Sequence, residues 1–292
     1  MKKYILIPLA LALAAGAASA DTLKKVADNN KITLAYREAS VPFSYLAGPD
    51  KPVGMMVEIS EAIAAEVKKA TGKPNLEVAW QAVTSANRIP LLTNGTVDLE
   101  CGSTTNNSTR GKEVQFAINH FYTGTRLLVK KNSGIKNYAD LSGKTVSTTT
   151  GTTNFQVLRK YNADKNLNIN IIAGKDHDDS KLLVETGRAV AFGMDDILLY
   201  GLKAADRNPA DWDVVGEALQ VEPYACMLRK DDPKFQQLVN GVIGNMMKNG
   251  EFEKLYTKWF TSPIPPRNVN LNFPMAQELK DNLKAQSDKP AI

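Results

Sequence analysis

The hydrophobic pattern of the chain alternates between short apolar runs and longer helical periods. Residues 31–36, 76–80 and 96–101 are apolar runs typical of strands, and residues 52–72 and 86–95 between them have the pattern of helices. A β-α-β-α-β order of this kind favours a parallel sheet that is covered by helices. We therefore predict an α/β fold.

The alternation starts again after about residue 126. Predicted elements follow in the order strand 125–131, strand 143–150, helix 154–162, strand 168–172, helix 180–188 and strand 189–194. A last strand is predicted within residues 222–233, and helical periodicity then covers residues 233–250 and 251–260. The Pro-rich segment from residue 262 onward predicts an extended arm that is partly disordered at its end.

Residues 1–20 have the three parts of a secretory signal peptide. A positive start, "MKK", precedes the apolar run "YILIPLALALAAG" and the small-residue cleavage signature "ASA". Cleavage after Ala20 leaves Asp21 as the first residue, and the absence of a cysteine there argues against a lipid anchor. No later stretch reaches about 18 apolar residues, so we expect an exported and soluble chain.

The net charge is a weak indication of function. The formal charge is +5, and loss of Lys2 and Lys3 with the signal peptide leaves about +3. Such a charge helps to attract anionic ligands, although a solvated basic surface without a role is the more common case. No run of five Lys or Arg residues occurs, so nucleic acid is not predicted as a partner.

Local enzyme signatures are absent from the sequence. It contains no G-x-S-x-G, H-E-x-x-H, C-x-x-C, G-x-G-x-x-G or Walker A motif, and its two histidines are His120 and His177. Two histidines leave little for a zinc site or a network of general bases. A catalytic triad assembled in space stays open, but the chain is predicted to need no metal and no cofactor.

Two hydroxyl-rich loops occupy equivalent places in the two β/α sets. Residues 102–107, "GSTTNN", follow one predicted strand, and residues 148–154, "TTTGTTN", connect another strand to a helix. Ligands of open α/β sheets bind at the carboxyl ends of strands, and a helix start offers N–H groups to an anion. Either loop alone is also explained by ordinary capping and turn chemistry. Together they indicate a polar cleft between two domains.

Charged residues also follow predicted strands. Three arginines, Arg37, Arg88 and Arg110, lie near such strand ends. An isolated arginine is usually solvated, but the guanidinium group pairs bidentately with carboxylates, and three of them favour an anionic ligand. His177, Asp195 and Asp196 follow later strands, where a carboxylate can hold an ammonium group. The implied ligand is small and zwitterionic, with more anionic than cationic groups.

Several longer segments carry a family resemblance. They are "YREASVPFSY", "TSANRIPLLTNGTVDLECGSTTN", "FYTGTRLLVKK", "GTTNFQVL", "GRAVAFGMDD", "YACMLRKDDP" and the closing "WF" with "PIPP". Together they resemble the periplasmic glutamate/aspartate-binding proteins of amino-acid ABC transporters, in solute-binding protein family 3. The resemblance extends over about residues 31 to 275.

This resemblance implies a two-lobed periplasmic-binding-protein-like fold of type II, with lobes joined by two hinge strands. After the signal peptide (1–20), lobe 1 is expected over residues 21–126 and lobe 2 over residues 127–222. Residues 223–292 are expected to return to lobe 1 and to end in a C-terminal tail.

The resemblance also implies a set of ligand contacts. The side-chain carboxylate of the ligand is expected to meet Arg37, Ser85 and Arg88, with His177 reaching across from lobe 2. The α-carboxylate is expected at Thr105, Arg110 and Thr153, and the α-ammonium group at Ser103 and Asp195. The segment 106–112 and Gln156 depart from the family pattern, and both bear on ligand preference.

The chain contains two cysteines, Cys101 and Cys226. In an exported protein an even number of cysteines suggests a disulfide, and two buried free thiols are the alternative. The resemblance places the two residues on neighbouring strands of one lobe, and we therefore predict that they are bonded. Closing a loop of roughly 125 residues stabilises a fold by about 4–5 kcal/mol in the chain-entropy model.

The sequence and the resemblance together predict a monomeric periplasmic protein that binds L-glutamate and L-aspartate and catalyses no reaction. An inner-membrane ABC permease is the expected partner, and it would recognise the closed form. A binder of glutamine or another polar amino acid is one alternative, which Arg37 and Arg88 argue against because a neutral amide leaves them unpaired. A prephenate-type dehydratase on the same fold is the other, with His177 as the only candidate acid or base.

Overall fold

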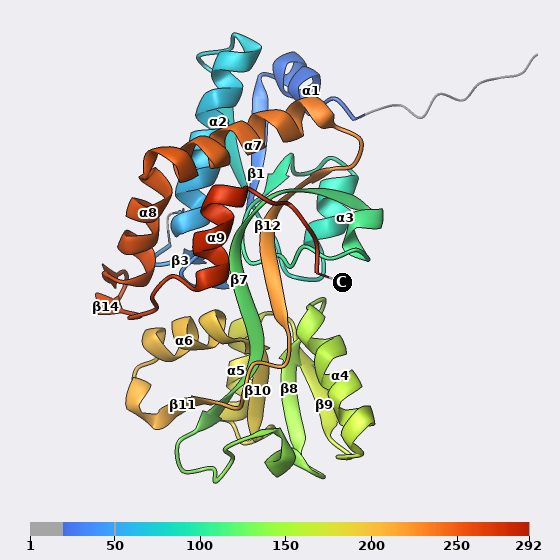
Figure 1. The fold of residues 1–292 in the computed structure, drawn as a ribbon, viewed down its shortest axis with the longest axis vertical. Helices are drawn as coiled ribbons and strands as arrows, with labels where there is room; N and C mark the ends of the chain where they lie inside the picture. The colour runs from blue at the N-terminus through green and yellow to red at the C-terminus, as the bar shows by residue number, and fades with distance from the viewer. Residues whose placement is uncertain (1–19, 50, 292) are drawn as a thin grey trace, which may run out of the picture.

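We describe the protein from a computed structural model that covers residues 20–49 and 51–291 (Figure 1). The predicted signal peptide, except for Ala20, lies outside the described residues. The helices are α1 (Thr22–Asn29), α2 (Met55–Thr71), α3 (Arg88–Thr93), α4 (Thr153–Lys165), α5 (His177–Glu185), α6 (Asp196–Ala205), α7 (Pro233–Asn249), α8 (Glu251–Phe260) and α9 (Gln277–Ala285). Short 3-10 helices are η1 (Arg110–Lys112), η2 (Tyr138–Leu141) and η3 (Pro209–Asp211).

The strands are β1 (Lys31–Tyr36), β2 (Ala39–Ser40), β3 (Ser44–Leu46), β4 (Pro52–Val53), β5 (Glu77–Ala82), β6 (Leu99–Glu100), β7 (Val114–Lys130), β8 (Thr145–Thr149), β9 (Asn170–Gly174), β10 (Ala191–Asp195), β11 (Trp212–Val215), β12 (Val221–Arg229), β13 (Pro263–Ile264) and β14 (Val269–Asn270). The main sheet has the order β5-β1-β6-β12-β7-β10-β8-β9, with β11 also paired to β7. β1 runs parallel to β5 and β6, and β8 runs parallel to β9 and β10. We call the part that holds β1, β5 and β6 lobe 1, and the part that holds β8, β9 and β10 lobe 2.

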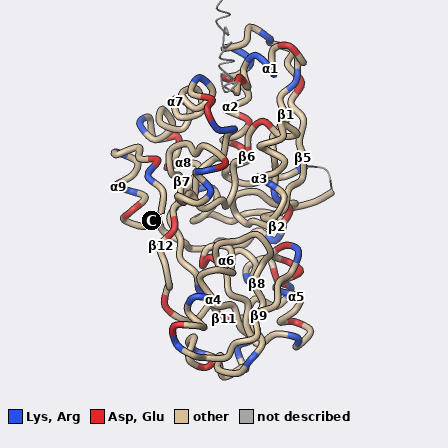
Figure 2. The backbone as a smooth tube through the Cα atoms, turned by 90° about the vertical axis from the view of Figure 1, so that its right-hand side faces the viewer, with Lys and Arg blue, Asp and Glu red and all other residues tan. Residues whose placement is uncertain are grey.

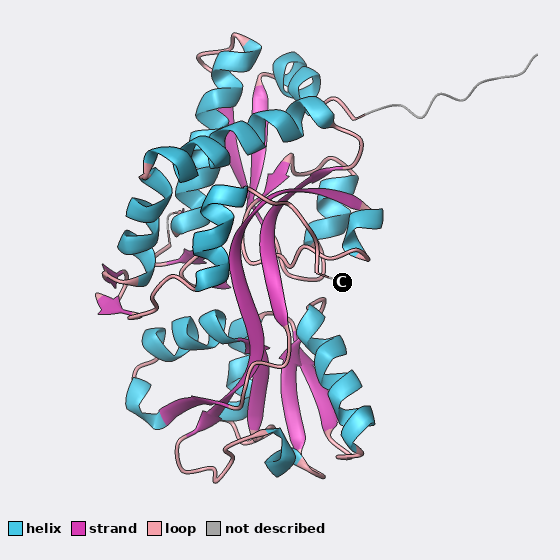
Figure 3. Ribbon diagram, in the orientation of Figure 1, coloured by secondary structure: helices cyan, strands magenta, loops and turns pink. Residues whose placement is uncertain are grey.

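Two long antiparallel strands connect the lobes, as Figure 3 shows. β7 pairs with β12 up to Gly124, and from Thr125 onward it pairs with β10 and β11. The predicted two-lobed α/β fold, with two strands joining the lobes, is confirmed. The expected lobe limits at 126/127 and 222/223 fall inside β7 and β12.

No strand is predicted from the sequence for the first half of β7. Asn119 and His120 interrupt its apolar run, yet both side chains are buried in the structure. Asn119 binds the C-terminal segment, and a ring nitrogen of His120 lies 3.0 Å from the carbonyl oxygen of Gly102. Polar groups are tolerated in a buried strand when they have partners, and such partners are invisible to local periodicity.

The helices pack around each end of the sheet. In Figure 1, α2, α7, α8 and α9 gather around lobe 1, and α4, α5 and α6 surround the strands of lobe 2. The core of lobe 1 centres on Phe43, whose ring centroid lies 4.9 Å from that of Phe121 and 5.4 Å from those of Tyr224 and Phe260. These ring contacts pack β7, β12 and α8 against one another in a single aromatic cluster.

The surface charge and the helices show two further features. Figure 2 shows basic and acidic residues interspersed along both lobes, so the positive net charge is not gathered into one basic region. Within the described ranges, no helix combines the length and the apolar character that a membrane span requires.

The C-terminal segment differs from the predicted extended arm. It forms α9 and then returns along lobe 1 over residues 286–291. Leu279 is buried in the core, and the Asn282 amide donates a hydrogen bond to the backbone carbonyl of Asn119 (2.7 Å). The prediction of a partly disordered tail is therefore wrong for the described residues. The Pro-rich start of the segment conceals the amphipathic helix that follows it.

Candidate ligand-binding site

A small cavity of about 10 Å³ lies between the two lobes. It is lined by Ser85, Arg88, Ser103, Thr105, Arg110, Thr152, Thr153, Asn154, His177, Met194, Asp195 and Leu198. Arg37 lies beside this wall and contacts Ser85 and His177. The structure therefore brings together all the residues that were predicted to contact the ligand. A cavity of this volume holds about one water molecule, so the lobes have to move apart before a larger ligand can enter.

The cavity wall consists of segments that follow strands. Lobe 1 contributes residues that follow β5 and β6, and lobe 2 contributes residues at the ends of β8, β9 and β10. This is the position that open α/β sheets use for ligands. The two hydroxyl-rich loops face one another across the cavity, with Thr105 Oγ1 only 3.3 Å from Thr153 Oγ1.

Arg37 and Arg88 form a buried cationic pair at one end of the site. Arg37 Nη2 donates to Ser85 Oγ (3.0 Å), and Arg88 Nη1 donates to the carbonyl oxygen of Ser103 (3.3 Å). Among the described residues, Arg37 Nη1 and Arg88 Nε have no hydrogen-bond partner, and neither side chain forms an ion pair. Burial, and then the neighbouring Arg88, lower the pKa of Arg37 to about 9. Buried donors of this kind strongly favour an anion.

His177 reaches this cationic pair from lobe 2. Its Nε2 lies 3.3 Å from Arg37 Nη2, and its Nδ1 lies 3.0 Å from Thr149 Oγ1. Because a guanidinium group only donates, we assign Nε2 as the acceptor and Nδ1 as the protonated nitrogen. Burial, followed by the charges of Arg37 and Arg88, holds the pKa of His177 well below its usual value. The imidazole is therefore neutral at neutral pH.

Arg110 occupies the other end of the site and connects the lobes. Its Nη1 donates to the Thr105 carbonyl oxygen (2.9 Å), and its Nη2 donates to the Gly151 carbonyl oxygen in lobe 2 (3.1 Å). Burial, and then Arg88, lower the pKa of Arg110 to about 10, so the guanidinium stays charged at neutral pH. A charged group held at two backbone oxygens is well placed to clamp a carboxylate.

Glu222 joins Thr105 and Thr153 behind the cavity. Its Oε2 accepts a hydrogen bond from Thr105 Oγ1 (2.8 Å) and another from Thr153 Oγ1 (2.6 Å). Glu222 lies in β12 and is 1% exposed, so one buried carboxylate binds both lobes. Each hydroxyl has one proton, and in this arrangement each threonine uses that proton for its hydrogen bond to Glu222. The two threonines therefore present lone pairs to the cavity.

Asp195 is the acidic group of the cavity wall. Its Oδ1 accepts a hydrogen bond from Asn154 Nδ2 (2.8 Å), and its Oδ2 accepts one from the Tyr224 hydroxyl. Burial, and then the like charge of Glu222, raise the pKa of Asp195 to about 7. A cationic ligand group favours the charged carboxylate of Asp195, because it offsets both effects.

Three other residues singled out in the sequence have different surroundings. Ser103 lines the cavity and donates from Oγ to Ser40 Oγ (3.1 Å). Asp196 does not line the cavity. Its carboxylate accepts a hydrogen bond from Thr123 Oγ1 (2.6 Å). Gln156 does not line the cavity but lies in an adjoining groove, which shares Arg110, Thr152 and Thr153 with it.

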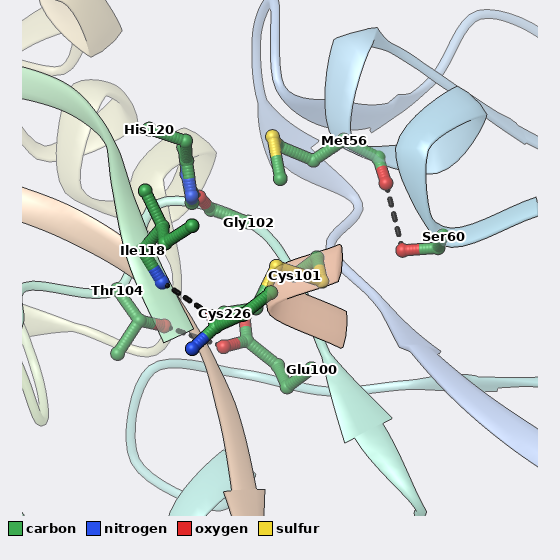
Figure 4. Close-up of a disulfide and its surroundings, with 10 residues drawn as sticks. Met56, Ser60, Glu100, Cys101, Gly102, Thr104, Ile118, His120 and Cys226 are labelled. Carbon is green, nitrogen blue, oxygen red and sulfur yellow. Dashed lines mark hydrogen bonds between the residues drawn. A yellow bond between two sulfur atoms is a disulfide. The ribbon is translucent and has the colours of Figure 1, made fainter. Parts of the chain in front are cut away.

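Cys101 and Cys226 form a disulfide, as predicted (Figure 4). Cys101 directly follows β6 and Cys226 lies in β12, the antiparallel neighbour of β6. The bond attaches the start of the Ser103–Thr105 loop to the strand that carries Glu222. It therefore connects a loop of the cavity wall to the strand behind the cavity.

Glu222, Tyr224 and Asn154 are not predicted from the sequence as site residues. Residues 222 and 224 alternate along one strand, and side chains two residues apart point to the same face. That signal indicates a polar face on the connecting strand, but it does not indicate which lobe residues meet that face. Asn154 lies in the first turn of α4, within the hydroxyl-rich segment.

Residues 32–262 match the family model of bacterial extracellular solute-binding proteins, family 3. The chain belongs to this family. It is 50% identical over 271 residues to an L-glutamate/L-aspartate-binding protein of Pseudomonas aeruginosa, covering 92% of this chain and 90% of the relative. A glutamate/aspartate import solute-binding protein of Escherichia coli K12 is 48% identical over 289 residues, with 96% of each chain covered.

A solved family 3-like structure agrees with this fold. An ancestral amino acid-binding protein, described as a precursor of cyclohexadienyl dehydratase, has a TM-score of 0.70 and 26% sequence identity, covering 82% of this chain and 100% of that chain. The relatives with about half of their residues identical are named as binding proteins, not as enzymes.

Proposed function

We propose that this protein captures L-glutamate and L-aspartate in the interlobe cavity and delivers them to an ABC permease. The observation that carries the proposal is the pair of buried guanidinium groups, Arg37 and Arg88, with donors that have no partner among the described residues. A second carboxylate on the ligand supplies the anion that these donors lack. The names of the relatives from Pseudomonas aeruginosa and Escherichia coli support the same ligands.

The geometry supports one orientation of the ligand. The side-chain carboxylate lies at Arg37, Ser85 and Arg88, close to the neutral imidazole of His177. The opposite end of the cavity then receives the amino-acid backbone, with its carboxylate at Arg110 and its ammonium group at Asp195 and Ser103.

Thr105 and Thr153 border the backbone end of the ligand in this orientation. Both threonine hydroxyls donate their hydrogen bonds to Glu222, so neither can donate to the α-carboxylate. The donors for the α-carboxylate come instead from Arg110 and from backbone N–H groups at the start of α4. The threonine lone pairs then face the ammonium group. In this orientation Glu222 sets the direction of both hydroxyl groups.

Ligand capture in this proposal is a shift between an open and a closed arrangement of the lobes. Arg37 meets His177 and Arg110 meets the Gly151 carbonyl oxygen only when the lobes are together. A ligand that contacts both lobes favours the closed arrangement. The proposed lobe limits lie near residues 126 and 222, inside the two connecting strands, where a small rotation of the backbone would move a whole lobe.

We further propose that the mature protein is periplasmic and monomeric, with cleavage after Ala20. The predicted signal sequence and the extracellular family description support the location. Mass spectrometry of protein exported from cells should give a chain that begins at Asp21. Retention of residues 1–20 would contradict the cleavage, and sedimentation at the mass of a dimer would contradict the monomer.

Isothermal titration with glutamate, aspartate, glutamine and arginine tests the ligand class. We expect tight binding of the two acidic amino acids and much weaker binding of glutamine and arginine. Binding of glutamine as tight as that of glutamate would overturn the proposal. Incubation with prephenate tests the dehydratase alternative, and we expect no turnover because both ring nitrogens of His177 already have partners, Arg37 and Thr149.

A further inference from the structure

The last residues of the chain lie against the strands that connect the lobes. Figure 1 shows the segment after α9 crossing β7 and β12 and ending at the lower edge of lobe 1. The backbone N–H of Ala291 donates to the carbonyl oxygen of Asn106 (2.9 Å), and Ala291 pairs with Asn107 in a parallel bridge. Asn106 and Asn107 belong to the loop that carries Thr105 and leads to Arg110.

Asn119 in β7 is the main attachment point of this segment. Its backbone N–H donates to the Ser287 carbonyl oxygen (2.9 Å), and its Nδ2 donates to the Lys289 carbonyl oxygen (2.8 Å). Its own carbonyl oxygen accepts from Asn282 Nδ2 (2.7 Å). A residue that is 1% exposed thus directs its backbone and side-chain groups to the C-terminal segment.

Asn106 connects the same segment to the ligand loop. Its Nδ2 donates to Asn119 Oδ1 (2.9 Å) and to the Asp288 carbonyl oxygen (2.8 Å). Its backbone N–H donates to the Pro223 carbonyl oxygen in β12 (2.8 Å). Asn106 is 2% exposed, so these bonds form away from water and hold the loop firmly to both connecting strands.

The residues on either side of Asn106 hold Arg110. The backbone N–H of Arg110 donates to Asn107 Oδ1 (2.9 Å), and its guanidinium Nη1 donates to the Thr105 carbonyl oxygen (2.9 Å). A shift of the backbone at Asn106 therefore moves both anchors of Arg110 together. No residue of the C-terminal segment lines the cavity itself.

We propose that residues 286–291 are a strap that positions Arg110 for the ligand. This inference rests on the proposed function, because it assigns the strap an effect on affinity for acidic amino acids. Without the strap, Asn106 loses two hydrogen bonds, one to the Asp288 carbonyl oxygen and one from the Ala291 N–H, and the loop from Thr105 to Arg110 gains freedom. Arg110 then has to be ordered by the ligand, and this ordering lowers the affinity.

The test is a double-mutant cycle measured by isothermal titration with L-glutamate on the mature chain. One variant lacks residues 287–292, a second is Arg110→Lys, and the third combines both changes. We expect deletion to weaken binding about tenfold when Arg110 is present, and less than about threefold in the Arg110→Lys background. An equal loss in both backgrounds, or no loss in either, overturns the positioning role.

A milder variant and a control variant distinguish a loss of positioning from a general loss of folding. Removal of residues 291 and 292 deletes only the bridge to Asn106 and Asn107 within the described residues, and we expect a loss of about threefold with an unchanged unfolding temperature. Gln277→Ala, whose exposed amide bonds only Asp281, should bind like the unmodified chain. Failure of the unmodified chain to bind glutamate would instead contradict the proposed function, so the two failures are distinguishable.

Discussion

The two ends of the cavity differ in how their charges are satisfied. At one end, Arg37 and Arg88 are buried without an ion-pair partner among the described residues, and each has a donor without an acceptor. At the other end, Arg110 donates to two backbone oxygens, and Asp195 accepts from Asn154 and Tyr224. At the first end the buried carboxylate of Glu100 only partly offsets the lowering of both arginine pKa values and forms no ion pair with either side chain. The second end is a nearly complete network before any ligand is considered.

This difference suggests that one end of the cavity recognises the backbone of any amino acid and that the other end selects the side chain. A preorganised network with one acid and one arginine suits the backbone that all amino acids share. Unpaired buried guanidinium groups suit only a ligand that brings a second carboxylate, because any other side chain leaves their desolvation without compensation. The acidic-ligand preference in our proposal therefore resides at the Arg37 and Arg88 end.

The largest expected effect on affinity follows from removing one of the two unpaired arginines. Arg88→Ala should weaken glutamate and aspartate binding by about 2–5 kcal/mol, since a desolvated ligand carboxylate loses a charged partner. Isothermal titration should show a much smaller change for any residual glutamine binding. Arg188→Ala, an exposed arginine of lobe 2, is the matched control. Equal losses for glutamate and glutamine would contradict the division between the two ends.

Asp195→Asn should weaken all amino-acid ligands alike, by about 10-fold to 100-fold, because the ammonium group loses a charged acceptor. The pKa of Asp195 is raised to about 7, so the carboxyl group holds a proton below that pH in the ligand-free protein. Binding of an ammonium group releases this proton. The affinity should therefore rise with pH between about 5 and about 7 and then level off.

Titrations at several pH values check this prediction. Burial and the charges of Arg37 and Arg88 hold the pKa of His177 well below its usual value, which moves its titration away from that of Asp195. The Asp195→Asn variant should show no such rise in affinity. Its ligand-free form should also lose the decline in stability that a raised carboxyl pKa causes as the pH increases from about 4 to about 7. An unchanged pH profile in the variant would exclude Asp195 as the titrating group.

Closure of the lobes should bring the residues at both ends of the cavity into contact with the ligand, so opposing it should weaken the binding of every amino acid. Gly201 lies in α6, and a Cβ there would lie 2.5 Å from the Val41 carbonyl oxygen of lobe 1. Gly201→Ala should therefore weaken glutamate and glutamine equally, by about tenfold, because it opposes the approach of the lobes. Small-angle scattering with saturating glutamate should show a less compact protein than the unmodified chain.

Gly241→Ala provides the matched control for this prediction. Gly241 is also inside a helix, α7, but a Cβ there would have no atom within 4 Å. Alanine favours a helix by about 1 kcal/mol over glycine, so both variants should unfold at the same or a higher temperature. A fall in the unfolding temperature of Gly201→Ala alone would show a folding defect instead of a closure defect.

The smallest expected effect on binding is that of the disulfide. Replacing Cys101 and Cys226 with alanine should lower the free energy of unfolding by about 2–5 kcal/mol. The affinity for glutamate should change less than about threefold, because Met227 and Glu100 still pair β12 with β6. Thermal unfolding and titration of the same preparation measure both quantities. A large loss of affinity in protein that is still folded would show that the bond positions the ligand loop directly.

Local pattern is a good guide to most elements of this protein, including β12, but a poor guide to the first half of β7 and to the tail. The alternating runs predict β1, β5, β8 and β10, because apolar residues at regular spacing bury one face of an element. The first half of β7 escapes prediction because Asn119 and His120 are buried through distant partners. The tail escapes it because the bonds that hold it belong to residues more than a hundred positions away.

The sequence by itself determines the α/β alternation, the two hydroxyl-rich loops, the arginines at strand ends and the pair of cysteines. It determines these features because spacing, turn chemistry and side-chain charge are local properties. Tertiary structure alone decides that Arg37 meets His177, that Glu222 accepts a hydrogen bond from a threonine of each lobe, and that the C-terminal segment holds Asn106. Those partners are brought together by the packing of two lobes around β7 and β12, which no periodicity of the chain encodes.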